Sequence, residues 1–239
     1  MTNVLTCARR TLWVFSILAT CMVTSHARAQ ARWYLSMRGT DTLSLERFER
    51  AGNTITGVWV TYHIGAARQI WRHEYTIALA ADGRAQSVHM LFRRPDSAVT
   101  RTYDARFSDD TAVVTETPDT LPPHRIAAHR GYPLLGLSIA MYELFVAGAR
   151  AGKQAPDSGA AVVVPITGPF VAQNMSGALL SANAFGFSGP GSSTIYTGAR
   201  GAVDSLLIAG GRVVVRRVDA FDIDAIARAA SLSGRERDR

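Results

Sequence analysis

The sequence predicts a mainly β domain of the α+β type. In it, a curved antiparallel sheet or half-barrel wraps around one apolar helix, and a short helix follows near the C-terminus. Over much of the chain, apolar and polar residues alternate with a period of two, which is typical of half-buried strands. Clusters of Gly, Asn and Asp separate these stretches and indicate tight turns. One apolar stretch at residues 133–151 has the length of a helix instead.

Residues 1–29 have the organisation of a cleavable signal peptide. Arg9 and Arg10 form a positive segment, and residues 12–23 follow as an apolar run without charge that is too short to span a bilayer. Ala27 and Ala29 then supply the small side chains that a signal peptidase reads. We therefore expect cleavage after Ala29, with cleavage after Ala31 as the nearby alternative, and a periplasmic or secreted domain.

Cys21 leaves a second form of export open, because Leu18 to Cys21 has the shape of a lipoprotein box. Thr20 is larger than the residue preferred before a lipidated cysteine, so plain secretion is the favoured expectation. The chain's two cysteines, Cys7 and Cys21, both lie in the predicted signal peptide. We therefore expect a mature domain with no disulfide and no thiolate ligand for a metal.

The charge balance fits a soluble domain with no nucleic-acid partner. The whole chain carries a formal charge of +7, and loss of three arginines with the signal peptide leaves +4. The remaining chain of about 210 residues suits one sizeable core. We expect a single domain over residues 30–234 and a frayed tail at residues 235–239.

Residues 30–117 predict a meander of sequential hairpins. The clearest strand places Trp71, His73 and Tyr75 on one face, with charged side chains between them. The Asp82–Gly83 pair then predicts a turn into the next strand. A sheet of this kind needs an apolar partner against its inner face.

A linker at residues 118–132 and a helix at residues 133–151 are expected next. Prolines exclude the first segment from a sheet interior, while Pro133 suits a first helical residue and Gly152 suits a helix end. Large apolar side chains cover most of this helix, so we expect other structure to wrap it. Its narrow stripe of small or charged residues includes Glu143, for which we expect an ion pair or a solvent-facing position.

Strands resume over residues 158–218 and end in a hairpin that turns at residues 209–211. Residues 222–231 predict a short helix, in which Asp222 and Asp224 suit the positive end of the helix dipole. The glycine-rich stretch at residues 186–191 predicts a flexible loop, because no lysine follows it as in a phosphate-binding loop.

The search for catalytic motifs returns near misses. Ser138 lies in Gly-Leu-Ser-Ile-Ala, one residue short of a nucleophile elbow, and we expect it inside the helix with its hydroxyl bonded to the backbone. The mature histidines lack the helical spacing of a zinc site, and His73 is expected in the core or at its rim. We therefore expect no metal and no cofactor.

Three stretches resemble the N-terminal region of a group of uncharacterised exported β-rich bacterial proteins. They are DTLSLERFERAGNTITGV from Asp41, YTIALAADGR from Tyr75 and RVVVRRVDAFDIDAIARAASLSGR from Arg212. The resemblance covers most of the mature chain and implies no assigned activity or catalytic residue. The predicted order of elements is also loosely similar to that of periplasmic lipoprotein carriers.

The leading functional hypothesis is a non-catalytic domain that holds a lipid or other apolar molecule between sheet and helix. An alternative is a structural or adaptor module whose helix fills the sheet and which contacts an envelope protein. A third is a serine-type hydrolase using Ser138 or Glu143. The candidate ligand-binding residues of the leading hypothesis are Trp71, Tyr75, Met141, Tyr142, Leu144 and Phe145.

Overall fold

The computed structural model describes residues 30–62, 70–93, 101–117, 122–151, 157–163, 171–188, 193–198, 202–208 and 211–226. The predicted signal peptide, with Cys21, and the predicted tail at residues 235–239 lie outside these residues. Within the described ranges, fifteen strands form one continuous curved sheet. No helix in these ranges is long and apolar enough to cross a membrane.

The first part of the sheet is an antiparallel meander, as the alternating pattern predicts. Its strands are β1 (Arg32–Arg38), β2 (Asp41–Ala51), β3 (Thr54–Tyr62), β4 (Ile70–Leu79), β5 (Ala85–Arg93), β6 (Arg101–Phe107), β7 (Thr111–Thr117) and β8 (His124–Ala127). Gly52 and Gly83 adopt positive φ angles in the turns after β2 and β4, where a glycine carries no steric cost.

The second part contains one long helix and the remaining strands. In chain order these elements are β9 (Tyr132–Leu134), α1 (Ile139–Ala151), β10 (Asp157–Val163), β11 (Val171–Ser181), β12 (Ala184–Ser188), β13 (Ser193–Thr197), β14 (Val203–Ile208) and β15 (Val213–Val218). β9 and β10 pair in parallel, whereas the pairs from β10 through β15 are antiparallel.

The two parts form one sheet because β1 pairs with β2 on one side and with β15 on the other. The outermost strands of the sheet are β8 and β9. These strands are consecutive in the chain and are joined by residues 128–131 alone, which span at most about 18 Å between Ala127 and Tyr132. The sheet must therefore curl until its two edges approach, without closing into a barrel.

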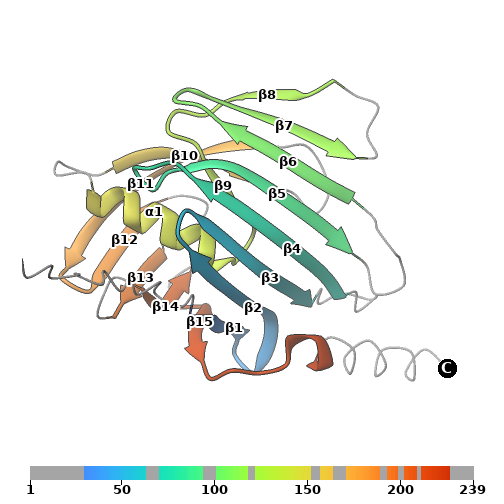
Figure 1. Cartoon of the computed structure of the whole chain (residues 1–239). Coiled ribbons are helices and arrows are strands. Elements are labelled where there is room, and N and C mark those ends of the chain that lie inside the picture. The colour runs from blue at the N-terminus through green and yellow to red at the C-terminus, as the bar shows by residue number, and fades with distance from the viewer. Residues whose placement is uncertain are drawn as a thin grey trace, which may run out of the picture.

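Helix α1 lies inside this curve, between β1–β8 and β10–β15 (Figure 1). The predicted fold class is therefore confirmed. Ile139, Met141, Leu144 and Phe145 are at most 2% exposed and belong to the large apolar cluster that fills the curve. His73 is fully buried in the same interior, with its ring 4.9 Å from Trp59 and 4.4 Å from Phe92. Of the two positions expected for His73, in the core or at its rim, the structure shows the core.

The expected start of the helix at Pro133 is wrong. Tyr132, Pro133 and Leu134 form edge strand β9, and the helix begins six residues later at Ile139. Proline is tolerated at a sheet edge, and a buried edge strand has the same continuous apolar composition as a wrapped helix. The expected linker is also partly wrong, because His124–Ala127 form β8.

The glycine-rich stretch predicted as a loop begins inside a strand. Gly186 to Ser188 belong to β12, and the rest of that stretch lies outside the described residues. β12 pairs with β11, a strand that the sequence pattern also did not indicate. In the expected C-terminal helix, residues 223–226 are helical and residues 227–231 lie outside the described part.

The start of this C-terminal helix covers part of the outer face of the sheet. Ile223 packs with Leu45, Val60 and Ile70 in a second, smaller apolar cluster. A carboxylate oxygen of Asp222 accepts bonds of 3.0 Å from the amides of Asp224 and Ala225, so this residue caps the helix. The acidic first turn therefore has a capping role as well as a dipole contribution.

Candidate functional site

Glu46 is the most buried acid of the described interior and binds the start of α1. It is 2% exposed, and its Oε1 accepts hydrogen bonds of 2.6 Å from both the Tyr75 hydroxyl and the Ser138 hydroxyl. Its Oε2 accepts a 2.5 Å bond from the amide of Ile139, the first residue of the helix. A carboxylate from β2 therefore satisfies the exposed amide end of α1 and fixes the helix to the sheet.

Burial raises the pKa of Glu46 to about 7, against the lowering effect of the bonds from Ser138, Tyr75 and Ile139. Burial is also the largest cause that raises the pKa of Tyr75 well above its usual value, and the adjacent Glu46 adds to it. The Tyr75 hydroxyl therefore keeps its proton and remains a hydrogen-bond donor, whereas the Glu46 carboxyl changes its charge near neutral pH.

Two glycines make room for this arrangement. A Cβ on Gly57 would lie 2.3 Å from the Tyr75 ring, so the tyrosine lies flat across β3 only because this position has no side chain. Gly136 has a φ of +47°, and a Cβ there would lie 2.5 Å from the Trp59 ring. This turn before α1 therefore depends on glycine for both its conformation and its close packing.

Glu143 fixes the middle of α1, and of the two positions expected for it, ion-paired or solvent-facing, the structure shows the ion pair. Its Oε1 binds the guanidinium of Arg32 and accepts a 3.0 Å bond from the amide of Val203. Burial raises the pKa of Glu143, and Arg32 is the largest influence in the opposite direction. The Tyr34 hydroxyl donates a 2.6 Å bond to the Val203 carbonyl, so this cluster joins α1, β1 and β14.

The structure brings together five of the six predicted ligand-binding residues in the main apolar cluster, and Tyr75 is the one of these five that lies on the sheet. Met141, Tyr142, Leu144 and Phe145 share the main apolar cluster. The Phe145 ring lies 5.6 Å from Tyr132 and 5.9 Å from both Phe185 and Phe187, as measured between ring centroids. This part of the interior is therefore packed by aromatic side chains.

Two of the six predicted residues, Tyr75 and Trp71, lie on the sheet. Tyr75 belongs to the main apolar cluster and also binds Glu46 through its hydroxyl. Trp71 is 6% exposed and belongs to neither apolar cluster of the described residues. Four neighbouring strands place Trp71, Thr61, Ser44 and Ser36 side by side in one row across the sheet, in the order β4, β3, β2 and β1. Ser36, Ser44 and Thr61, here termed the hydroxyl row, are all at most 6% exposed and face the interior beside Trp71.

The hydroxyl row lies beyond the first turn of α1. The helix begins at the level of Glu46, two residues along β2 from Ser44. From there the helix runs away from the row, since Arg150 in its last turn binds the Thr197 hydroxyl. Thr197 pairs with Val203, and the Val203 carbonyl binds the Tyr34 hydroxyl. The end of the helix therefore lies near the level of Tyr34 along β1, away from the level of Ser36. Among the described residues, no side chain of α1 hydrogen-bonds to the row.

Ser138 was expected inside the helix and bonded to its own backbone, and both expectations are wrong. It immediately precedes α1, is fully buried and donates its hydroxyl to Glu46. In the Ser-His-Asp arrangement a histidine accepts the proton of the nucleophilic hydroxyl, whereas here the Ser138 hydroxyl donates to a carboxylate. The histidines His89 and His129 instead bind Asp104 and Asp110 on the surface.

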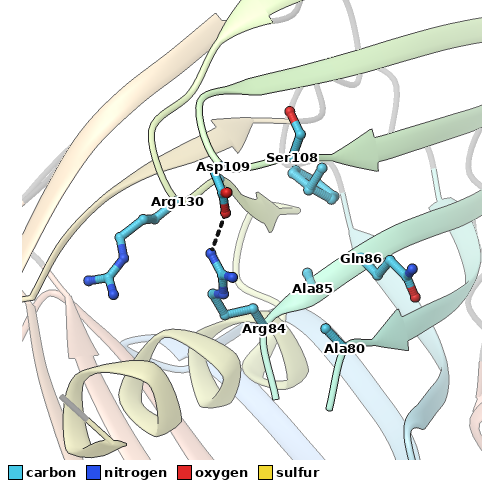
Figure 2. Close-up of a pocket in the computed structure, with 9 residues that line it drawn as sticks. Ala80, Arg84, Ala85, Gln86, Ser108, Asp109 and Arg130 are labelled. Carbon is cyan, nitrogen blue, oxygen red and sulfur yellow. Dashed lines mark hydrogen bonds and ion pairs between the residues drawn. The ribbon is translucent and has the colours of Figure 1, made fainter. Parts of the chain in front are cut away.

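A small cavity of about 80 Å³ lies at the other end of the sheet, among the turns after β4 and β6 and residues 130–131. Figure 2 shows Arg84 and Asp109 facing each other across it. Arg84 also binds Asp82, so its charge is balanced by two carboxylates. The cavity can hold a few ordered waters and is much smaller than a typical ligand site of about 300 Å³ or more.

Comparison of the chain with known proteins identifies the fold. No family model matches the chain, and no curated protein shows significant sequence similarity to it. Among solved structures, a DUF1089 family protein from Pseudomonas aeruginosa is similar with a TM-score of 0.54 and 9% identity, covering 69% of this chain and 89% of that chain. A β-barrel-like protein of the domain of unknown function DUF1849 from Brucella abortus gives a TM-score of 0.47 and 13% identity, covering 80% and 96%.

Both neighbours belong to families of unknown function, as the resemblance to uncharacterised β-rich bacterial proteins implies. At such low identity, the likeness to the Pseudomonas protein establishes a shared fold and no activity. Within the described ranges, no group of three or more His, Cys, Asp or Glu side chains is placed to hold a metal ion.

Proposed function

We propose that this domain acts outside the cytoplasm as a non-catalytic binding protein. Its ligand is an apolar or amphipathic small molecule, held between the concave face of the sheet and the first turn of α1. The location follows from the predicted signal peptide at residues 1–29. The proposed ligand site differs from the one that the sequence predicted around Phe145. Phe145 and its aromatic neighbours pack against one another there, beside the helix.

One observation carries the proposal: the inner face of the sheet continues past the start of α1. The helix begins at Glu46, while Ser44, Thr61 and Trp71 face the interior one row further along the strands. Trp71 lies in the same row and supplies an aromatic ring to the inner face of the sheet. A concave wall with an aromatic face and a few convergent polar groups has the composition of a small-molecule site.

Mass spectrometry under native conditions tests this proposal, together with solvent extraction, on the secreted protein purified without detergent. We expect a co-purifying apolar molecule in the natural protein. In Ser44→Leu the added side chain enters the proposed site, so the molecule should be lost while circular dichroism shows a folded sheet. Ser87→Leu is the matched control. Val88 is buried on the inner face of β5, so the neighbouring Ser87 lies on the outer face, and this variant should keep the molecule.

The alternative is the ligand-free adaptor, and the close packing of Phe145 favours it. A row of uncharged residues along the outer face offers a surface for an envelope partner: Ala178, Gly186, Thr194, Leu207, Val214 and Met37. A natural protein that carries no molecule and takes up neither added fatty alcohol nor phospholipid would overturn the binding proposal. That result would leave the adaptor as the better account.

A further inference from the structure

Three buried polar atoms near the start of α1 have no hydrogen-bond partner in the described part of the chain. They are Oγ of Ser44, Oγ1 of Thr61 and Nε1 of Trp59. Their residues are 1%, 6% and 3% exposed, so water does not hydrate them freely. Folded proteins leave few buried polar groups unpaired, and such a cluster points to a partner that is not part of the protein.

The three atoms belong to one small region of the inner face. Ser44 pairs with Thr61 across β2 and β3, and Trp59 pairs with Glu46 on the adjacent row of the same two strands. Adjacent rows on one face of a sheet are about 7 Å apart along the strand. A single small head group can therefore contact all three residues.

The chemistry of these residues selects the charge of that head group. Two hydroxyls and an indole N–H are neutral groups, and all three can donate a hydrogen bond to an oxygen. An anion would lie beside the Glu46 carboxyl and would need a cation to offset its burial. Arg32, on the same face of β1, is already paired with Glu143. A buried ammonium would find only the hydroxyl oxygens of the row as acceptors, because both oxygens of Glu46 already accept hydrogen bonds within the protein.

We infer that the ligand is an amphiphile with an uncharged, oxygen-bearing head group, such as an alcohol, ester or amide, recognised by Ser44, Thr61 and Trp59. This inference rests on the proposed binding function and adds the class of molecule to it. The apolar part of the ligand lies against the Trp71 side of the row. Glu46 takes no direct part, because its oxygens already accept bonds from Tyr75, Ser138 and Ile139.

Calorimetric titration of the secreted protein with 1-decanol and with decanoate at pH 8 tests the inference, because the two probes share a chain length and differ in charge. Decanol should bind at least tenfold more tightly. Thr61→Val, which removes the hydroxyl at nearly constant shape, should weaken decanol binding about fivefold, as expected for one hydrogen bond. Trp59→Phe should act in the same direction.

The melting temperature of Thr61→Val supplies a readout that is independent of binding. If the hydroxyl is unpaired in the free protein, its removal should leave the melting temperature unchanged or raise it, whereas a structural hydroxyl would lower it. Thr76→Val is the matched control, since Thr76 is exposed on the outer side of β4, and it should bind decanol as the natural protein does.

The outcomes distinguish the class of ligand from the binding function itself. Decanoate binding as tight as that of decanol, or a Thr61→Val protein with natural decanol affinity, would overturn the inference and leave the binding function intact. If neither probe binds and no molecule is extracted from the protein, the proposed function itself fails with it.

Discussion

The hydroxyl of Tyr75 donates a 2.6 Å hydrogen bond to Oε1 of Glu46, across a separation of 29 residues in the sequence. The same oxygen accepts a bond from Ser138, so one buried carboxylate links β2, β4 and the start of α1. The orientation of the helix inside the sheet therefore depends on a group whose charge can change near neutral pH.

The stability of the domain should fall as the pH rises toward neutrality. The pKa of Glu46 is raised from 4.5 to about 7 in the folded protein, so the folded state binds this proton more tightly than the unfolded state. Its stabilising contribution is complete below pH 4.5 and is lost as the pH rises through 7. We expect the free energy of unfolding to decrease by about 3 kcal/mol between pH 4.5 and 8 from this group, measured by urea denaturation.

Glu46→Gln and Ser138→Ala are the controls for this pH dependence. The Gln variant cannot ionise, so its stability should lack this decrease, whatever its absolute value. Removal of the Ser138 hydroxyl deletes a bond that lowers the pKa of Glu46, so the midpoint of the decrease should move to higher pH. A Gln variant with the natural pH profile would show that another group is responsible.

Gly57→Ala should destabilise the protein through Tyr75. The added methyl group would lie 2.3 Å from the tyrosine ring, which is itself 3% exposed and has little room to move. Overpacking of this kind costs about 1–3 kcal/mol, which chemical denaturation can measure. In a Tyr75→Ala background the ring is absent, and the same change should cost less than about 1 kcal/mol. Equal costs in both backgrounds would disprove the contact.

The strand meander and the wrapped helix could be predicted because both have a strong periodic pattern. β11 and β12 could not, because Gly177 and Gly186 weaken the signal of a strand interior. The structure explains Gly177, since a Cβ there would lie 2.3 Å from the Phe185 ring. A glycine that reads as a strand breaker is required here by close packing between neighbouring strands.

The candidate site was harder to predict than the fold. Glu46 and Ser44 face the interior, while Leu45 between them faces the outer cluster, so β2 reverses the usual distribution of polar and apolar side chains. The outer cluster forms only because Ile223, far along the chain, covers Leu45. The sequence of β2 does not show that a distant residue covers Leu45. Within this strand, Phe48 is the apolar side chain that indicates the internal face.

Removal of the Glu143 carboxylate should loosen α1 from β1 and β14. Glu143→Ala leaves the Arg32 guanidinium and the Val203 amide without their partner in a largely buried position. Loss of such a partner costs about 3 kcal/mol, which thermal or urea unfolding can measure. In an Arg32→Met background the cost should be smaller, because no buried cation remains. A cost that is the same in both backgrounds would mean that the pair contributes nothing.

The start of the C-terminal helix should open without unfolding the rest of the domain. Ile223 is its main apolar contact with the sheet, and Asp224 adds an ion pair with Arg72 on the partly exposed outer face. Ile223→Ala should therefore increase hydrogen exchange at residues 223–226 by about tenfold or more, the effect of at least 1.4 kcal/mol. Exchange in β3 and β4 near Tyr75 should stay unchanged, because the interior cluster does not contain Ile223. Ile226→Ala, at a position 38% exposed, should have little effect. Faster exchange throughout the sheet after Ile223→Ala would instead show that this helix and the core unfold as one unit.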